Sequence, residues 1–579
     1  ELSKAELILT YIVKGSSLVR GMRIAAKDRA ITIRKALYSM DYLFGDKDVT
    51  YFEGRHCSER TRRRASVGTG ALTFTSRRGA TSHQISNGFI LSDSSANEDG
   101  GNAVLMELLW SGSFTFFAEK NQYGSTRAAL GMGSEYFEYC LRDSYLDCPE
   151  LLLTFSDKGF GDLSVRNSRF IMDHIRHNPA SKLNAPVLLN NWEATYFGFT
   201  GEKLIEIARS AKALGCDLFV LDDGWFGHRN DDLSSLGDWY ENTEKLGMDL
   251  GSLSERIRKE GIAFGLWVEP EMVSEESDLY RKHPDWALRL EGRKPSRGRY
   301  QLVLDLTRKD VRDFILSFLT DLIERGKLSY MKWDYNRFIT DFFSSETPRG
   351  QIEYDYIIGL YSIFESLNSR FPSLMIEGCS GGGGRFDLGM LYCTPQSWLS
   401  DDTDAIERLD IEIGSSYLFP IASFGSHISA VPNHQTGRST PLFTRSTVAM
   451  LGSFGLELDP DSLSDAEKDE IRAEIVEYRK LSSLIRNGDF YRLNDTAEYS
   501  AAMVVSENKE EALLIAVNRL SHGNPLDRYA RLTGLDEKKI YRVNGMTMPG
   551  SLLVNAGLLI PFSFTVDYEA VRLHIKEAK

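Results

Sequence analysis

The chain has 579 residues, a formal net charge of -14 at pH 7 and 42% hydrophobic residues, which is the composition of an ordinary soluble globular protein. This length exceeds what one hydrophobic core supports, so we expect about three domains. Nucleic-acid-binding proteins are usually basic, so the acidic charge argues against DNA or RNA as a main partner.

The cysteines and the hydropathy of the sequence indicate the cellular compartment of the protein. The six cysteines are scattered without a CxxC pair, which argues against a zinc site and against a disulfide framework. We therefore expect reduced thiols and a cytoplasmic protein. The sequence contains no apolar run of about 18 residues, so no membrane span is predicted. The first residues lack the layout of a signal peptide and begin on a strand pattern, so we expect a fragment or a processed form.

Strand patterns dominate residues 1–165. Their apolar or alternating runs end in clusters of Gly, Ser or Asn, which is typical of antiparallel strands joined by turns. We predict an N-terminal β-sandwich here, incomplete at its N-terminus. The basic run Arg60–Arg64 is interpreted as a solvated loop, because such short runs carry little specificity.

A different pattern of predicted elements begins near residue 185. Eight short apolar runs end in polar residues and alternate with amphipathic helical segments; the runs cover residues 186–193, 218–225, 263–271, 301–307, 330–336, 375–380, 396–402 and 423–429. Eight strand-then-helix units indicate a (β/α)8 TIM barrel. No GxGxxG follows a strand, so a dinucleotide-binding fold is not supported.

These patterns predict three domains. Residues 1–165 form the N-terminal β-sandwich, and residues 166–486 form the catalytic barrel with the helix that follows it. Strand patterns return after that helix, so residues 487–579 are predicted to form a small antiparallel C-terminal β domain.

Polar residues gather at the C-terminal ends of the predicted barrel strands, the face on which TIM barrels build their active sites. They are Asp222, Asp223, Trp267, Glu269, Lys332, Asp334, Cys379, Asp401, Asp402 and His427. Asp334 and Asp401 follow different strands and could flank a glycosidic bond, which needs one ionised and one protonated carboxyl group. Lys332 lies on the same strand face as Asp334 and is expected to keep that carboxylate ionised.

The second carboxyl group needs the opposite environment. Asp401 must hold a proton, so its pKa would have to be raised by burial or by the neighbouring Asp402 and Asp404. Tryptophans near the strand ends could offer flat faces to a sugar; they are Trp192, Trp225, Trp267, Trp333 and Trp398.

Other chemistries are less well supported. Lys332 and Asp334 alone could be an ion pair that braces the barrel, but so many polar strand ends favour a reaction. The Asp-rich stretches 222–224 and 401–404 could attract a hard cation, yet they lack metal-site spacing, and Lys332 and Arg299 already supply positive charge. Cys379 is more simply a contact residue than a nucleophile, so neither a metal nor a cofactor is expected.

Seven long motifs carry a family resemblance. They are LDDGWFG (221–227), GLWVEPEMV (265–273), QLVLDL (301–306), KWDYNR (332–337), EGCSGGGGRFD (377–387), WLSDDTDA (398–405) and SAVPNHQTGR (429–438). In this order they resemble bacterial α-galactosidases of glycoside hydrolase family 36, and SRRGATSHQ (76–84) is similar to a motif of that family's N-terminal sandwich. The resemblance covers the whole chain and is densest over residues 186–455.

The resemblance implies a retaining hydrolase that removes terminal α-linked galactose from sugars such as melibiose and raffinose. Asp334 would be the nucleophile and Asp401 the acid/base, with their carboxyl groups about 5–5.5 Å apart. The substrate-binding residues implied are Asp222, Asp223, Trp267, Arg299, Lys332, Cys379, Gly381, Trp192 and Trp398. Cys379 and Gly381 would lie against carbon 2 of the sugar. The family uses no cofactor, and many members are homotetramers in which Trp192 would reach a neighbour's site.

The sequence departs from the family pattern at Asp402, where Asn is common. We expect this extra negative charge to raise the pKa of Asp401, and an unchanged pH–rate profile in Asp402→Asn would contradict that expectation. The family usually carries a longer N-terminal sandwich than this chain contains.

Three alternatives remain open. An α-galactosyltransferase of the raffinose-synthase type would use the same chemistry with a sugar acceptor. A non-catalytic α-galactoside-binding protein would keep the pocket without turnover. A metal-dependent enzyme on the same barrel would lose activity with a chelator. An α-N-acetylgalactosaminidase is less favoured, because Cys379 and the glycines at 381–384 would crowd a carbon-2 acetamido group.

Overall fold

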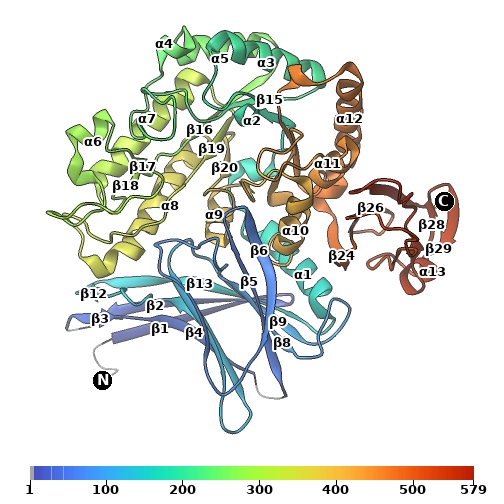
Figure 1. Cartoon of the computed structure of the whole chain (residues 1–579). Helices are drawn as coiled ribbons and strands as arrows, with labels where there is room; N and C mark the ends of the chain where they lie inside the picture. Colours follow the sequence, from blue (N-terminus) through green and yellow to red (C-terminus); the bar gives the residue numbers. More distant parts are fainter. Residues whose placement is uncertain (1–4, 28, 43–44, 579) are drawn as a thin grey trace.

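The computed structural model describes residues 5–27, 29–42 and 45–578. Figure 1 shows antiparallel strands at the N-terminal end, a central barrel surrounded by helices, and a sheet near the C-terminus. The predicted fold class is therefore confirmed.

Two antiparallel sheets make up most of the N-terminal part. One has the order β1-β2-β13-β9-β8-β5-β6 and the other β4-β11-β10-β7, and a ribbon pairs β12 with β3. Their bounds are β1 (Ala5–Lys14), β2 (Ser17–Ala26), β3 (Ile31–Ile33), β4 (Ala36–Tyr42), β5 (Lys47–Arg55), β6 (Ser58–Ser66), β7 (Leu72–Ser76), β8 (Gly88–Asp93), β9 (Ala103–Leu108), β10 (Phe114–Lys120), β11 (Thr126–Met132), β12 (Tyr139–Leu141) and β13 (Tyr145–Ser156). Phe89 of one sheet stacks on Phe116 of the other with ring centroids 4.0 Å apart, so the sheets pack face to face.

The basic run Arg60–Arg64 lies on strand β6, so its interpretation as a loop was wrong. Arg60 is only 3% exposed, and its guanidinium donates to the carbonyls of Gly383, at 2.7 Å, and Phe386, at 3.2 Å. The other arginines of the run are exposed. Charge in the sequence could not show that one side chain of the run anchors this hairpin to the barrel.

The barrel is closed by eight parallel strands. They are β14 (Leu188–Asn190), β15 (Leu218–Leu221), β16 (Ala263–Val268), β19 (Tyr330–Trp333), β20 (Met375–Gly378), β21 (Gln396–Trp398), β22 (Phe424–Ser429) and β23 (Ser453–Glu457). The ring closes where Leu188 of β14 pairs with Gly455 of β23. Apart from Ala263 at the start of β16, every residue of these strands is buried, as expected for a parallel sheet covered by helices.

One predicted barrel strand was wrong and one was missed. The run 301–307 contains β18 (Leu302–Val303), which pairs antiparallel with β17 (Met272–Val273) in an excursion after β16. The eighth barrel strand is β23, which follows α11 (Leu442–Ala449). Both segments are short apolar runs, and periodicity cannot tell a barrel strand from a two-stranded ribbon, because their partners are distant in sequence.

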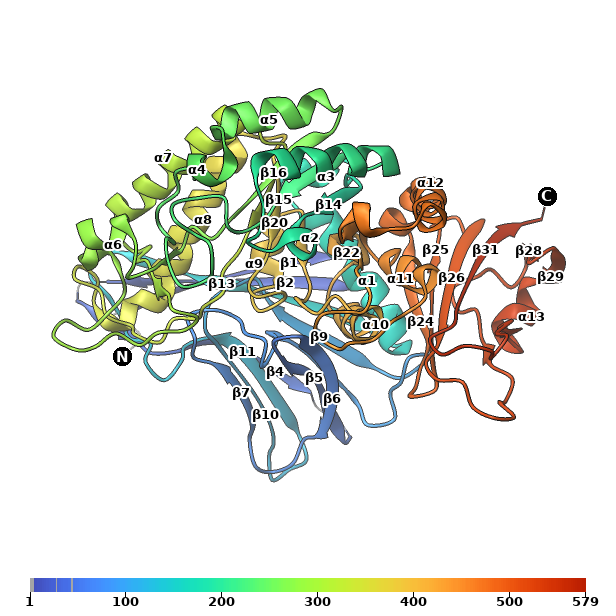
Figure 2. The ribbon, with the colours of Figure 1, turned by 45° about the horizontal axis from the view of Figure 1, so that its top comes forward.

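Helices surround the barrel, as Figures 1 and 2 show. The remaining α-helices are α1 (Gly159–His174), α2 (Trp192–Thr195), α3 (Gly201–Leu214), α4 (Thr243–Leu246), α5 (Leu250–Lys259), α6 (Asp278–Lys282), α7 (Lys309–Gly326), α8 (Ile352–Arg370), α9 (Leu388–Cys393), α10 (Ala405–Ser415), α12 (Asp465–Asn487) and α13 (Gly550–Asn555). Local chemistry sets their ends. The Thr200 side chain caps the start of α3, and Gly215 ends it with a left-handed φ of 104°.

The C-terminal part is a six-stranded antiparallel sheet beside α11 and α12 (Figure 2). Its order is β24 (Asp489–Asp495), β25 (Tyr499–Val505), β26 (Glu511–Asn518), β31 (Ala570–Glu577), β28 (Ile540–Val543) and β29 (Met546–Pro549), and a ribbon pairs β27 (Tyr529–Ala530) with β30 (Leu558–Leu559). Among the described residues, we find no helix with the length and hydropathy needed to cross a membrane.

A buried carboxylate ties together the segments under the barrel mouth. Glu271 accepts two hydrogen bonds from Arg385, at 2.6 and 3.0 Å, and both side chains are fully buried. It also accepts from the indole of Trp333 at 2.8 Å and from the hydroxyl of Tyr356 at 2.7 Å. The cluster joins the segment after β16 to β19, α8 and the loop before α9, and so holds the strand that precedes Asp334.

We predict that Arg385→Met lowers the free energy of unfolding by about 3–5 kcal/mol, because it leaves the Glu271 carboxylate buried without a cation. Urea unfolding followed by tryptophan fluorescence measures the change. The double variant Glu271→Gln/Arg385→Met should recover much of the loss, since glutamine still accepts from Trp333 without a charge. Lys309→Met removes an exposed ion pair with Asp313 and serves as the control with little effect. An Arg385→Met midpoint equal to that of Lys309→Met would contradict the prediction.

Candidate active site

A small polar pocket lies at the C-terminal ends of the barrel strands. Its volume is about 180 Å³, below the range of drug-sized pockets, so it suits one sugar ring better than a longer chain. Nine predicted site residues line it: Asp222, Asp223, Trp267, Arg299, Lys332, Asp334, Asp401, Trp192 and Trp398. Two larger cavities, of about 320 and 610 Å³, share Arg176 and Arg486, and the first reaches the opposite ends of the barrel strands.

Asp334 follows β19 and is held by four neutral donors. Its Oδ1 accepts from the backbone N–H of Tyr335, at 2.8 Å, and of Gly381, at 3.2 Å. Its Oδ2 accepts from the indole Nε1 of Trp267, at 3.2 Å, and from the Asn336 amide, at 2.6 Å. These bonds orient the buried carboxylate without neutralising it.

Lys332 does not pair with Asp334, so that expectation was wrong. Its Nζ lies 3.0 Å from Oδ2 of Asp222, which also accepts from the Asn190 amide at 2.6 Å. Burial works to lower the pKa of Lys332, but the negative charges of Asp222 and Glu457 outweigh it and raise the pKa well above its usual range. Lys332 is therefore a fixed cation in the pocket wall.

Asp223 is clamped by a residue that the sequence did not identify. The Arg229 guanidinium donates to both oxygens of Asp223, at 2.7 and 2.8 Å, and both residues are buried. Burial raises the pKa of Asp223 although Arg229 opposes the shift. The two-pronged contact fixes the plane of the carboxylate. Arg229 could not be found from the sequence, because its direction depends on the loop after β15.

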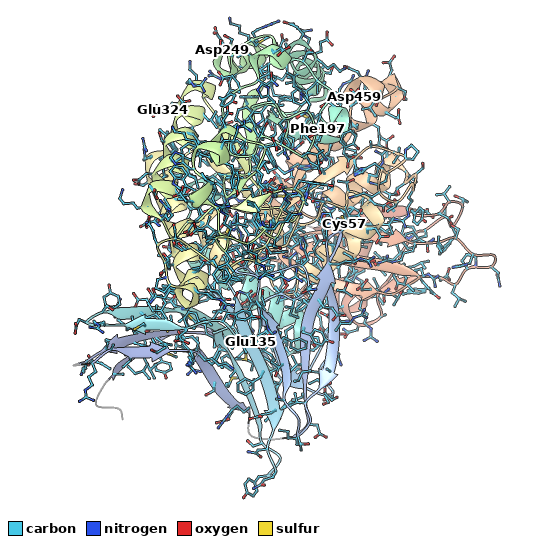
Figure 3. All side chains as sticks on the ribbon, turned by 60° about the vertical axis from the view of Figure 1, so that its left-hand side comes forward. Cys57, Glu135, Phe197, Asp249, Glu324 and Asp459 are labelled. Atoms are coloured by element: carbon cyan, nitrogen blue, oxygen red, sulfur yellow. The ribbon has the colours of Figure 1, made fainter. Side chains whose placement is uncertain are left out.

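Asp401 is paired with a histidine from the N-terminal sandwich. Nε2 of His56, in the turn between β5 and β6, lies 2.9 Å from Oδ2 of Asp401. Figure 3 shows the neighbouring Cys57 at the tip of this hairpin, against the barrel. Burial works to raise the pKa of Asp401, but the hydrogen bond and charge of His56 outweigh it and lower the pKa. The expectation of a raised pKa for Asp401 was therefore wrong.

Asp402 belongs to the support of the next helix. Its Oδ1 accepts from the backbone N–H of Asp404 at 2.9 Å, and Asp404 caps α10 and pairs with Arg438. Burial raises the pKa of Asp402 to about 6. Asp402 is next to Asp401 in sequence, but its carboxyl group supports α10. The side-chain contact to the Asp401 carboxyl group comes from His56.

Cys379 and Gly381 lie just behind the pocket lining. Cys379 is 3% exposed, and burial, together with the charges of Asp334 and Asp401, raises the pKa of its thiol well above the usual range. It is thus poorly suited to be a nucleophile. Gly381 has a left-handed φ of 53° and reaches Asp334 through its backbone N–H. That the two residues lie against carbon 2 of a sugar stays a prediction.

Aromatic and basic groups form the rim. Trp192, on α2, lines the pocket of its own chain and packs edge-on against Phe197, with ring centroids 5.3 Å apart. Contact of Trp192 with a neighbour's site stays a prediction. Arg299 has a left-handed φ of 50°. Desolvation of its guanidinium works to lower its pKa, but the charges of Glu269 and Asp334 outweigh this and raise the pKa.

Several pocket residues were missed by sequence reasoning; they are Glu193, Phe197, Asp232, Asn336, Thr403, His434, Gln435 and Glu457. Glu457 was missed because β23 was missed. Asn336 lies within the motif KWDYNR, and its amide holds Asp334. Its backbone N–H in turn donates to the buried Glu269 at 2.6 Å.

Three carboxylates of the Asp-rich stretches are paired with cations of the chain. Asp222 binds Lys332, Asp223 binds Arg229, and Asp404 binds Arg438. Within the described ranges, no group of three or more His, Cys, Asp or Glu side chains could hold a metal ion.

Comparisons with known proteins cover the whole chain. The family model described as Melibiase matches residues 144–488. The models for the glycosyl hydrolase family 36 N-terminal and C-terminal domains match residues 1–142 and 499–575.

Individual relatives agree with this result. The chain is 44% identical over 588 residues to a bifunctional alpha-galactosidase/sucrose kinase of Mediterraneibacter gnavus, which covers 100% of this chain and 62% of that protein. It thus spans about three fifths of that relative. An alpha-galactosidase of Lactobacillus acidophilus is 39% identical over 587 residues, covering 100% of this chain and 80% of that protein.

A solved structure has the same fold. A family 36 alpha-galactosidase of Geobacillus stearothermophilus in complex with raffinose superposes with a TM-score of 0.97 at 39% identity, covering 99% of this chain and 81% of that one.

We predict that Asp402→Asn stabilises the protein more at about pH 7 than at about pH 4. The pKa of about 6 for Asp402 lies roughly two units above that of an exposed aspartate. A raised pKa favours folding below the unfolded value and loses that contribution as the pH rises through the folded value, so the native chain loses about 3 kcal/mol across this window. Unfolding midpoints at both pH values test this. A difference between variant and native chain that does not change with pH would contradict it.

Proposed function

The chain belongs to glycoside hydrolase family 36, and we propose that it is a retaining α-galactosidase that hydrolyses terminal α-linked galactose of melibiose- and raffinose-type sugars. One observation carries the proposal: a monosaccharide-sized pocket joins Asp334, held by neutral donors, to Asp401, held by an imidazole. Two carboxyl groups in different environments are what double displacement needs. Relatives named alpha-galactosidases, and one solved with raffinose, support the substrate class.

In the first half of the proposed reaction, Asp334 attacks carbon 1 of the galactose. Tyr335 and Gly381 hold one carboxylate oxygen through their backbones, and Trp267 and Asn336 hold the other. These hydrogen bonds prevent the carboxylate from rotating and keep it oriented for attack on carbon 1. As the bond to carbon 1 forms, the glycosidic oxygen leaves with a proton from Asp401.

In the second half, a water molecule attacks carbon 1 and Asp334 leaves. Asp401, now ionised, accepts the proton of the water. Two inversions at carbon 1 give net retention. The first half of the reaction cannot occur without the Asp334 carboxylate, because this group forms the covalent bond to carbon 1 in the galactosyl-enzyme.

The pocket floor offers groups that can recognise galactose hydroxyls. Asp222 and Asp223 present carboxylate oxygens, and Lys332 presents an ammonium beside them. A sugar whose hydroxyl points away would not form a hydrogen bond with these buried groups, which opposes its binding. Discrimination of the axial carbon-4 hydroxyl of galactose from its equatorial epimer is proposed on this basis.

We also propose that the protein is a cytoplasmic homotetramer. Six free cysteine thiols suit a reducing compartment, and the tetramer rests on the family resemblance. Light scattering of the purified protein tests the tetramer, and a monomer at working concentration would overturn it.

The function is tested by product analysis with raffinose. We expect the native chain to release free galactose as its main product and Asp334→Ala to lose at least about 10³-fold in kcat, because no covalent intermediate can form. NMR at carbon 1 in early product should show retained α configuration. Asn368→Ala, at a residue that lines a different cavity, is the control for the effect of a substitution outside the active-site pocket.

Three outcomes would overturn the proposal. No galactose release by the native chain would favour a binding protein. Dominant transfer of galactose to a second raffinose molecule would favour a transferase. Initial β configuration would exclude a retaining mechanism.

A further inference from the structure

The hairpin of β5 and β6 reaches from the N-terminal sandwich into the barrel mouth. Arg60 anchors it by donating to Gly383 and Phe386, in the loop before α9. The contact is tight, because a Cβ on Gly383 would lie 2.4 Å from the Arg60 guanidinium. Glu59, next to Arg60, is only 2% exposed. The turn that carries His56 is therefore packed in place.

His56 contacts Asp401, the residue proposed to transfer a proton to the glycosidic oxygen. Its Nε2 lies 2.9 Å from Oδ2 of Asp401, and its Nδ1 lies 3.4 Å from the thiol of Cys57. Gln435 links the hairpin to the barrel at the same place. Its amide donates to the Asp401 carbonyl at 2.6 Å and contacts the thiol of Cys57 at 3.4 Å. The side chains of His56 and Asp401 are 54% and 32% exposed, so the pair can be reached from solvent.

The pairing raises a chemical question. A general acid needs a proton at the start of the reaction, but a carboxylate bound to an imidazolium is ionised. The hydrogen bond with Asp401 raises the pKa of His56 to about 10 while the pKa of Asp401 falls. The two groups together thus hold one proton over most of the pH range, and it is available to either of them.

Other ionisable groups surround the pair. Those facing it are Cys57 and Glu59 from the hairpin, His83 from the loop before β8, Arg299 from the excursion after β16, Lys332 and Asp334 from β19 and its end, and Cys379 after β20. Burial lowers the pKa of His83 and raises those of Cys57 and Cys379, which leaves these three neutral near neutral pH. Lys332 and Arg299 are cations, so they lower the pKa of Asp401 without supplying its proton.

We propose that His56 is a positioning residue that stores the proton of the acid/base Asp401, so that the N-terminal sandwich completes the catalytic pocket. This rests on the function proposed above. The Nε2 proton passes to Asp401, and Asp401 passes it to the glycosidic oxygen as the bond from carbon 1 to that oxygen breaks. The imidazole is then neutral. When water attacks carbon 1 and the ester to Asp334 breaks, Asp401 takes the water proton and returns it to Nε2.

The test is the pH profile of His56→Gln. Glutamine keeps an amide N–H within reach of Asp401 but cannot titrate, so Asp401 must hold the proton alone. In the native chain, kcat/KM for raffinose should persist until the pair loses its proton at high pH. In His56→Gln the basic limb should move to lower pH by at least about one unit, so the loss grows to about tenfold or more near pH 8 and shrinks near pH 5.

A second substrate separates proton supply from general damage. An aryl α-galactoside with a strongly acidic phenol needs little help from the acid, so its kcat/KM should be nearly equal in His56→Gln and the native chain at every pH. His177→Gln, an exposed histidine beside the cavities away from the active-site pocket, is the matched control and should match the native chain with both substrates.

Three other outcomes of these experiments would contradict either the role proposed for His56 or the proposed function. A basic limb for raffinose that stays in place in His56→Gln overturns the inference. So does an equal loss with both substrates at all pH values, which would indicate a purely structural role. If the native chain hydrolyses neither substrate, the proposed function itself fails, and this differs from failure of the inference alone.

Discussion

One constraint shapes this protein: carboxylates must stay oriented inside a pocket shielded by protein. Each carboxylate meets the constraint with a different partner. Asp222 has Lys332, Asp223 has the two-pronged contact of Arg229, and Asp401 has His56. Asp334 is the exception, because its four donors in the described structure are neutral. A carboxylate that must attack carbon keeps more of its charge available when no cation binds it directly, whereas binding carboxylates gain from being fixed.

Meeting this constraint requires more than one domain. The barrel strands supply Asp222, Lys332 and Asp334, but the partner of Asp401 arrives on a hairpin of the N-terminal sandwich. That hairpin is fixed through Arg60, a buried cation whose guanidinium binds backbone carbonyls of the barrel. Mounting the site on packed strands and a packed hairpin gives positions that loops alone would not hold. The sandwich therefore takes part in the active site besides packing against the barrel.

Sequence reasoning succeeded where the signal was local and repeated. Strand and helix periods predicted the barrel, and six of the polar residues predicted at strand ends line one pocket; Trp192, Arg299 and Trp398, which the family resemblance implied, line it too. It failed where an identity depended on a distant partner. The run at 301–307 and strand β23 are both short and apolar, and only their pairing separates them. Lys332 was assigned to Asp334 by proximity in sequence, whereas Asp222, on another strand, is its partner.

Local sequence patterns specified most of the elements, the fold class and the identities of the carboxylates, because hydrophobic period and residue chemistry are properties of short segments. Tertiary structure alone decided which partner each carboxylate meets. Asp401 shows the difference: its neighbours in sequence are acidic and suggested a raised pKa, but folding brings His56 within 2.9 Å and lowers it. Electrostatic interactions act through space, and residues 345 positions apart in the chain become nearest neighbours only after folding.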